Sequence, residues 1–217
     1  MRRNLNWFLR RFIIGKFARE VYPTKITGAE NLPAGPCVVV AGPHKSGKET
    51  IIIPGYLQYR EFTIMVKAEL FKIPVVGWVL REGGCIPVPR GNGRGIEAVA
   101  PAIDALNHGK TLLIFPEATR RHDDFTHVGK TGAIRFALKA GVPIVIIALK
   151  GMRGNGPREM IICKPYDPQI ERRLILRKLA NEASDGLVLR LLTAGLMRRM
   201  AKVSGTKYIE DKRGNKA

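Results

Sequence analysis

Short apolar runs rich in β-branched residues alternate along this chain with longer segments of helical periodicity. Two of the runs, 37–41 (CVVVA) and 111–115 (TLLIF), are apolar enough for strands buried on both faces. Further strands are expected near 61–66, 85–88, 143–149 and 159–163, and helices near 3–18, 48–59, 69–80, 95–107 and 130–140. This alternation predicts an α/β fold with a central, mostly parallel or mixed sheet flanked by helices.

A polar cluster follows each of the two buried runs. Residues 42–49 (GPHKSGKE) come after the first run, and residues 115–120 (FPEATR) end the second and follow it. Each cluster is therefore expected at the carboxyl end of a strand. That is where open α/β sheets place their ligand crevices.

His44 is the residue of the first cluster best suited to acid–base chemistry. An ordinary histidine pKa of about 6.5 lets a neutral imidazole take a proton from an alcohol at physiological pH. Glu49 is a candidate to fix its tautomer, because a carboxylate that accepts from one ring nitrogen leaves the other free as base. Taken alone, His44 reads equally well as a buried, hydrogen-bonded histidine beside a helix cap.

Four blocks of the chain change that balance. They are His44 to Glu49, then 84–90 (GCIPVPR), 115–120 (FPEATR) and 142–148 (VPIVIIA). In this order and spacing the chain resembles the glycerolipid acyltransferases typified by 1-acylglycerol-3-phosphate acyltransferase. That family carries a His, four residues and an Asp, then a glycine-to-arginine strand block, Phe-Pro-Glu-Gly-Thr-Arg, and a late Val-Pro-Ile-Val strand. The resemblance covers about residues 25–150.

Two residues depart from the family pattern. Glu49 stands where the family has Asp, so its arm is one methylene longer, and either the turn or the approach of the carboxylate must differ. Ala118 stands where the family has Gly, which predicts an ordinary backbone at that position because alanine rarely takes a positive φ.

The resemblance implies direct transfer of an acyl chain from acyl-CoA or acyl-carrier protein to the hydroxyl of lysophosphatidic acid, giving phosphatidic acid, with no cofactor, no metal and no acyl-enzyme. His44 is implied as the general base and Glu49 as the residue that orients it. Cations suit the acceptor phosphate, and a carboxylate is implied in the acceptor pocket. The implied substrate-binding residues are Arg90, Glu117, Thr119, Arg120 and Lys67. Another lysolipid or a glycolipid is the nearest alternative acceptor.

Three other motifs point to other kinds of site. Residues 42–48 hold most of a phosphate-binding loop, but Glu49 follows where magnesium needs Ser or Thr, and its charge would repel phosphates. Residues 93–98 (GRGIEA) match a dinucleotide fingerprint loosely and read equally well as a glycine loop. His122, Asp123, Asp124 and His127 have side chains that bind metals, although a solvated loop is the simpler interpretation.

The charge of the chain predicts an anionic partner. The formal net charge is +19, from 37 Lys and Arg against 18 Asp and Glu. Near the amino end, aromatic and aliphatic residues interleave with arginines over residues 2–19, as in a basic amphipathic helix that lies among lipid headgroups. A helix packed on the core is the alternative. We expect an anionic membrane and no nucleic acid. A nonenzymatic basic module that binds lipid or nucleic acid is the rival of a different class.

No apolar run approaches the roughly 20 residues of a membrane-spanning helix, so a peripheral protein on the cytoplasmic face of the cell membrane is expected. Cys37, Cys85 and Cys163 are widely spaced, which suits reduced thiols. We divide the chain into a membrane-associating helical segment (1–24), an acyltransferase α/β domain (25–204) that ends in basic helices after Asp167, and a flexible basic tail (205–217).

Overall fold

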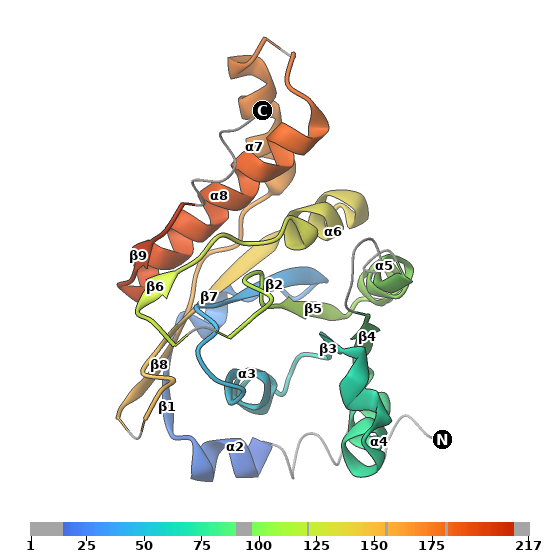
Figure 1. Cartoon of the computed structure of the whole chain (residues 1–217), viewed down its shortest axis with the longest axis vertical. Coiled ribbons are helices and arrows are strands. Elements are labelled where there is room, and N and C mark those ends of the chain that lie inside the picture. Colours follow the sequence, from blue (N-terminus) through green and yellow to red (C-terminus); the bar gives the residue numbers. More distant parts are fainter. Residues whose placement is uncertain (1–14, 90–96, 121, 155, 181, 211–217) are drawn as a thin grey trace.

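A seven-stranded sheet forms the centre of the molecule, in the order β1-β8-β7-β2-β5-β3-β4 (Figure 1). The computed structural model describes residues 15–89, 97–120, 122–154, 156–180 and 182–210. The strands of the sheet are β1 (Thr24–Thr27), β2 (Cys37–Gly42), β3 (Phe62–Lys67), β4 (Ile86–Val88), β5 (Thr111–Ile114), β7 (Ile144–Lys150) and β8 (Arg158–Ile162). A second, two-stranded sheet pairs β6 (Phe125–Thr126) with β9 (Lys207–Tyr208).

The directions of the strands decide which loops meet. Strands β7, β2, β5, β3 and β4 run parallel, β8 runs antiparallel to β7, and β1 runs parallel to β8. The predicted α/β class with a mostly parallel or mixed sheet is therefore confirmed. The carboxyl ends of β2, β5 and β3 share one edge, and the amino ends of β8 and β1 lie at that same edge.

Helices cover both faces of the sheet. They are α2 (Gly15–Val21), α3 (Glu49–Tyr56), α4 (Pro74–Glu82), α5 (Val99–Asn107), α6 (Gly132–Ala140), α7 (Pro168–Lys178) and α8 (Asp185–Ser204), with short 3-10 helices η2 (Ala29–Asn31) and η3 (Ala68–Lys72). In Figure 1, α2 and α3 lie on one side of the sheet and α6 and α8 on the other. Helix α4 lies away from the sheet, beyond β4.

The alternation of side chains along β2 explains why both faces are covered. Val38 and Val40 pack in the cluster that contains α5, α6 and α8, whereas Val39 and Ala41 pack in the cluster that contains α3. All four side chains are fully buried. Burying a valine side chain contributes roughly 1.5–3 kcal/mol relative to leaving it exposed, so a central strand with two apolar faces favours a sheet layered between helices.

The elements differ from the sequence prediction in a few places. The helix predicted over 69–80 is broken, because Pro74 has no N–H to donate and holds Ile73 in an extended conformation, so η3 ends there and α4 begins. Strands β1, β6 and β9 were not predicted. β9 lies in the tail expected to fray from Gly205, where the N–H of Ile209 also donates to the carbonyl of Thr126.

Most of the helix predicted over 3–18 lies outside the described residues, and its basic amphipathic character stays a prediction. Helix α2, which includes the last residues of that range, packs against α3. Within the described part of the chain, no helix is long and apolar enough to cross a membrane.

Candidate active site

The turn that carries His44 leaves the middle of the sheet. Strand β2 ends at Gly42, the Gly42–Pro43 peptide bond is cis, and α3 begins at Glu49. A Cβ on Gly42 would lie 2.4 Å from Sδ of Met200, so glycine lets α8 pack directly against the strand end. We call residues 42–49 the histidine turn.

His44 and Glu49 face each other inside this turn. Nδ1 of His44 lies 3.6 Å from Oε2 of Glu49, longer than a hydrogen bond, and neither buried atom has another hydrogen-bond partner among the described residues. The other oxygen, Oε1, accepts from the backbone N–H groups of Lys45 (3.0 Å) and Ser46 (2.7 Å). The longer glutamate arm thus reaches the turn with one oxygen and the imidazole with the other.

Burial sets the protonation of this pair. Desolvation, followed by the charges of Arg120 and Lys67, lowers the pKa of His44 to about 4, so the imidazole is neutral at physiological pH. Burial also raises the pKa of Glu49, whereas the hydrogen bonds that its carboxylate accepts from backbone N–H groups lower it. Because Nδ1 faces Glu49, Nε2 is the nitrogen available to take a proton.

The segment after β5 holds the histidine from two sides. The rings of Phe115 and His44 stack with centroids 4.3 Å apart and planes 29° from parallel. Glu117 is buried, and its carboxylate accepts from the backbone N–H of His44 (3.0 Å) and of His127 (3.3 Å). Glu117 therefore fastens the histidine turn to the chain that follows β5. Its place in an acceptor pocket stays a prediction.

The backbone at Ala118 contradicts the sequence prediction. Its φ is 57°, in the left-handed region, although an alanine was expected to have ordinary geometry there. The chain makes a tight turn from Phe115 to Ala118, closed by the N–H of Ala118 donating to the carbonyl of Phe115 at 3.0 Å. Closing this turn while Glu117 reaches the histidine turn imposes the conformation that glycine would adopt more easily.

Lys45 was not predicted to belong to the site. Its side chain is only 8% exposed, and its ammonium donates to the carbonyls of Asp123 and Phe125. The ammonium also lies 3.6 Å from Oδ1 of Asp123, whose carboxylate is bound by Nε2 of His127 at 2.8 and 2.9 Å. Hydrogen bonding to His127 lowers the pKa of Asp123. The loop 122–127 is thus tied to the histidine turn.

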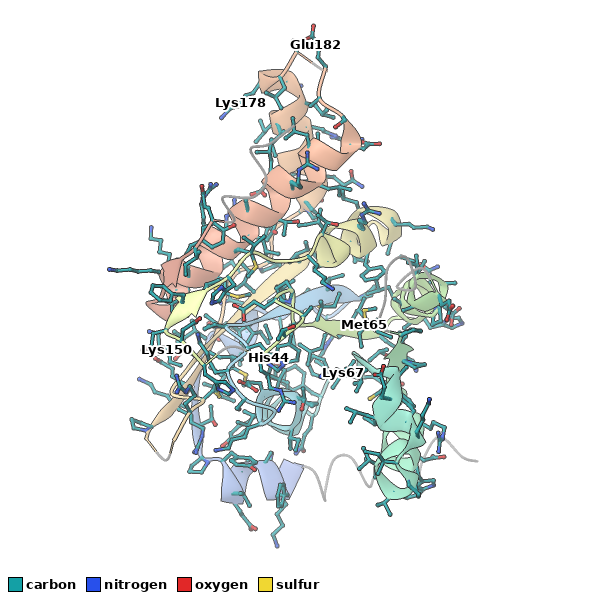
Figure 2. The ribbon with its side chains drawn as sticks, in the orientation of Figure 1. His44, Met65, Lys67, Lys150, Lys178 and Glu182 are labelled. Atoms are coloured by element: carbon teal, nitrogen blue, oxygen red, sulfur yellow. The ribbon has the colours of Figure 1, made fainter. Side chains whose placement is uncertain are left out.

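Two of the predicted phosphate-binding cations lie near the histidine. Lys67 ends β3, and Nη1 of Arg120 lies 3.5 Å from where a Cβ on Gly47 would stand. Both side chains are exposed, and both lower the pKa of His44 through their charge (Figure 2 labels His44 and Lys67). Thr119 is exposed beside Arg120. Arg90 lies outside the described residues, two positions after β4 ends at Val88 next to Lys67.

The alternative motifs receive little support. A phosphate-binding loop offers its backbone N–H groups to phosphate, but those of Lys45 and Ser46 are taken by Glu49. Asp123 and His127 bind each other, and the described residues contain no group of three or more potential metal ligands. Most of the glycine motif at 93–98 lies outside the described part of the chain.

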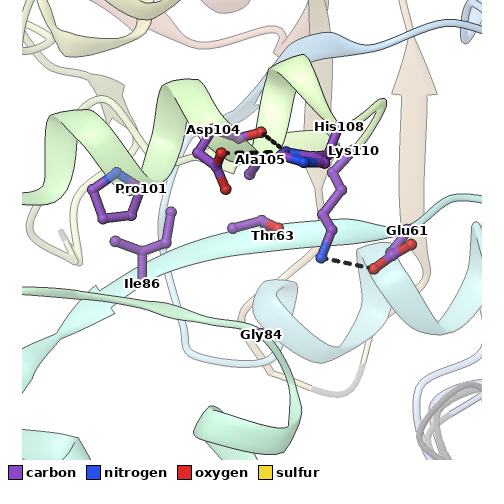
Figure 3. Close-up of a pocket in the computed structure, with 9 residues that line it drawn as sticks. All are labelled: Glu61, Thr63, Gly84, Ile86, Pro101, Asp104, Ala105, His108 and Lys110. Atoms are coloured by element: carbon purple, nitrogen blue, oxygen red, sulfur yellow. Dashed lines mark hydrogen bonds and ion pairs between the residues drawn. The ribbon is translucent and has the colours of Figure 1, made fainter. Parts of the chain in front are cut away.

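A cavity of about 490 Å³ opens at the opposite edge of the sheet (Figure 3). Its lining includes Glu61 and Lys110, which precede β3 and β5 and form an ion pair of 2.9 Å. His108 and Asp104 of the same lining also pair, with 3.3 Å between Nδ1 and Oδ1. This cavity lies at the amino ends of the strands and is separate from the histidine site.

The sequence model of the family described as Acyltransferase matches residues 23–150. The chain belongs to this family. The matched range contains His44 and the residues around it that come from β2, β3, β5 and the segments that follow these strands, as far as His127. Helices α7 and α8 lie beyond it, although Met200 of α8 packs against the end of β2.

Two named acyltransferases show the extent of the similarity. A chloroplastic 1-acyl-sn-glycerol-3-phosphate acyltransferase, BAT2, of Brassica napus is 32% identical over 178 residues, which cover 76% of this chain and 51% of that protein. The 1-acyl-sn-glycerol-3-phosphate acyltransferase of Bacillus subtilis is 33% identical over 148 residues, covering 65% and 72% respectively. The chain thus spans about half the length of the Brassica relative.

The fold resembles a solved acyltransferase over nearly its whole length. The crystal structure of the 1-acyl-sn-glycerophosphate acyltransferase PlsC from Thermotoga maritima matches with a TM-score of 0.71 and 24% identity, over 97% of this chain and 85% of that one. At this level of identity the similarity concerns the fold, and it agrees with the sheet and helix layers described above.

Proposed function

We propose that this protein transfers a fatty acyl chain from an acyl thioester to the free hydroxyl of lysophosphatidic acid, forming phosphatidic acid. The observation that carries the proposal is the pair of the mostly buried His44 and the fully buried Glu49, 3.6 Å apart at the carboxyl edge of the sheet, with a neutral imidazole beside two exposed cations. Membership of the acyltransferase family and the names of its relatives support the same reaction and acceptor.

The chemistry follows from the placement of the pair. Nε2 of His44 takes the proton of the acceptor hydroxyl while its oxygen attacks the thioester carbonyl. The tetrahedral intermediate collapses with loss of the C–S bond, and the proton passes from the imidazolium to the leaving thiolate. Glu49 orients the ring through Nδ1 and stabilises the imidazolium while it exists. No cofactor takes part, since acyl-CoA or acyl-carrier protein enters as a substrate.

The acceptor phosphate is assigned to the cations nearest the histidine. In lysophosphatidic acid the carbon that bears the phosphate adjoins the carbon that bears the free hydroxyl, so the phosphate must bind within a few bonds of Nε2. Lys67 and Arg120 are close enough to lower the pKa of His44, and Arg90 follows β4 nearby in sequence. Thr119 lies beside Arg120 as a further polar contact.

The protein is proposed to act as a peripheral enzyme on the cytoplasmic face of an anionic membrane. Helix α4 packs on η3 and leaves large apolar side chains in solvent: Val75 is 74% exposed, Trp78 is 56% exposed and Val79 is 45% exposed. An exposed apolar patch of this kind marks a contact surface. With the basic segment 1–24 and the net charge of +19, it favours a lipid surface.

The acceptor assignment is tested by identifying the product. Purified protein is incubated with palmitoyl-CoA or palmitoyl-carrier protein and with lysophospholipids that differ only in headgroup, and lipids are analysed by mass spectrometry. The proposal predicts phosphatidic acid as the preferred product, and a raised KM for lysophosphatidic acid in Lys67→Ala and Arg120→Ala. Faster acylation of another lysolipid or of a glycolipid would show that this lipid, and not lysophosphatidic acid, is the preferred acceptor. No acylation of any acceptor would favour the nonenzymatic binding module.

A further inference from the structure

A second group of cations lies on the other flank of the site, around Tyr22. The aromatic ring has the ammonium of Lys48 at 5.6 Å and the guanidinium of Arg158 at 5.5 Å from its centroid. The backbone of Tyr22 is held in place, because its carbonyl accepts from the hydroxyls of Tyr56 and Thr24. Lys25 follows three positions later at the start of β1. We call Tyr22, Lys25, Lys48 and Arg158 the Tyr22 patch.

Two residues of the Tyr22 patch, Lys25 and Arg158, line a cavity of about 460 Å³ together with Pro23, Thr24, Gly156 and Pro157. Arg158 is buried, with only 8% of its surface exposed. One Nη of its guanidinium donates to the carbonyl of Gly154 at 3.2 Å, but its Nε has no hydrogen-bond partner among the described residues. No carboxylate of the described residues forms an ion pair with Lys25, Lys48 or Arg158. Cations gathered without acidic partners favour an anionic ligand.

The strand register places the patch at the catalytic edge. Gly42 at the end of β2 pairs with Ala148 of β7, and Ala148 pairs with Ile161 of β8. Because β8 runs antiparallel to β7, Arg158 lies three residues from Ile161 toward the carboxyl edge of the sheet, the edge at which His44 follows β2. Strand β8 is two strands from β2, or about 10 Å at the usual spacing of ~4.8 Å. Arg158 shares the face of β8 with Met160 and Ile162, which pack against α3, and Lys48 directly precedes α3.

We propose that the Tyr22 patch binds the phosphate of the donor's phosphopantetheine arm, the group that coenzyme A and acyl-carrier protein share. The inference rests on the proposed acyl transfer. The acceptor phosphate must lie beside the attacking hydroxyl, which suits Lys67 and Arg120. The donor phosphate lies at the far end of the arm from the thioester, which suits a cationic site set apart from His44 by two strands. Lys48 belongs both to the Tyr22 patch and to the histidine turn, four residues after His44.

Calorimetric titration with phosphopantetheine and with pantetheine, which differ only in the phosphate, tests the site without turnover. We expect phosphopantetheine to bind wild-type protein on the order of tenfold more tightly, a difference equal to about 1.4 kcal/mol. The preference should disappear in Lys48→Gln, Lys25→Gln and Arg158→Gln and persist in Lys202→Gln, an exposed lysine on α8. Equal binding of the two compounds by wild type would overturn the proposal. The lysine variants keep the test decisive if the Arg158 variant does not fold.

Turnover then identifies the source of the phosphate. The patch variants should raise the KM for palmitoyl-CoA and for palmitoyl-carrier protein about tenfold while the KM for lysophosphatidic acid stays unchanged. A rise confined to palmitoyl-CoA would overturn the assignment to the shared arm in favour of the nucleotide phosphates. A rise confined to the acceptor would overturn it in favour of the acceptor phosphate. Absence of any acyl transfer would contradict the proposed function, whereas the titration would still report the phosphate preference.

Discussion

At the scale of single residues, the site depends on a carboxylate that does two tasks. Glu49 caps two backbone N–H groups of the histidine turn with one oxygen and faces Nδ1 of His44 with the other. The sequence predicted the pairing of the two residues and that the extra methylene must be accommodated. It could not predict the division of the two oxygens, because that depends on how tightly residues 44–49 turn.

The mostly buried His44 should make the free energy of unfolding depend on pH. Between pH 6.5, its ordinary pKa, and about 4, its pKa in the fold, the unfolded chain binds a proton at this residue before the folded chain does. The free energy of unfolding therefore falls as the pH falls through this window, by about 3 kcal/mol from His44 alone. In His44→Gln this loss should be absent, as measured by urea unfolding at pH 7 and pH 4.5. An equal loss in both proteins would contradict the burial of His44.

The positive φ of Ala118 predicts that a substitution at the site stabilises the protein. Glycine adopts the left-handed region without steric cost, so Ala118→Gly should raise the free energy of unfolding by about 1 kcal/mol. Ala180→Gly, at the other described alanine with a positive φ (49°), is the matched control away from the site. Thermal unfolding measures both. If Ala118→Gly instead lowers the free energy of unfolding, as glycine does inside a helix, the result would contradict the positive φ of Ala118.

At the scale of elements, parallel strands explain why distant segments meet. The buried runs and the turn after each were enough to predict that 42–49 and 115–120 lie at strand ends. The structure adds that β2 and β5 are neighbours, so the two segments meet. The tie between Lys45 and the loop 122–127 could not be predicted, since a lysine next to a histidine carries no signal of burial. The break between η3 and α4 was readable from Pro74 in principle.

Lys45 should act by holding the histidine turn in position. Lys45→Met removes the ammonium that binds two carbonyls of the loop 122–127, so we expect a loss of about 1–3 kcal/mol in the free energy of unfolding and a fall in kcat of roughly tenfold. The KM values for donor and acceptor should change little. Lys139→Met, at an exposed lysine of α6, is the control. Raised KM values with an unchanged kcat would instead place Lys45 in substrate binding.

At the scale of the whole molecule, charge and apolar surface point to the same partner. The chain carries a net charge of +19. Helix α4 lies away from the sheet (Figure 1), and its valines and tryptophan are exposed. Composition predicted the anionic partner, but it could not reveal α4 as an exposed apolar helix, because a run such as PVVGWVL reads equally well as a core helix. Only its sparse packing against the rest of the fold distinguishes the two.

The emission of Trp78 tests whether α4 meets the membrane. In a Trp7→Phe background Trp78 is the sole tryptophan, and its emission should shift to shorter wavelength when vesicles containing anionic lipid are added. Val75→Ser with Val79→Ser should weaken vesicle binding, whereas Ile170→Ser with Leu174→Ser on α7, at residues 57% and 50% exposed, should not. Unshifted emission from vesicle-bound protein would show that another surface makes the contact.

The most direct test of the account is acceptor-dependent thiol release from palmitoyl-CoA with lysophosphatidic acid, compared between wild type, His44→Ala, Glu49→Asp and the exposed-histidine control His108→Ala. We predict a loss in kcat of at least about 100-fold for His44→Ala, with vesicle binding retained, and no change for His108→Ala. Glu49→Asp, although it restores the family residue, should lose roughly tenfold, because the shorter arm cannot reach both the turn and the imidazole. Turnover by His44→Ala at the wild-type rate would contradict the assignment of His44 as the base.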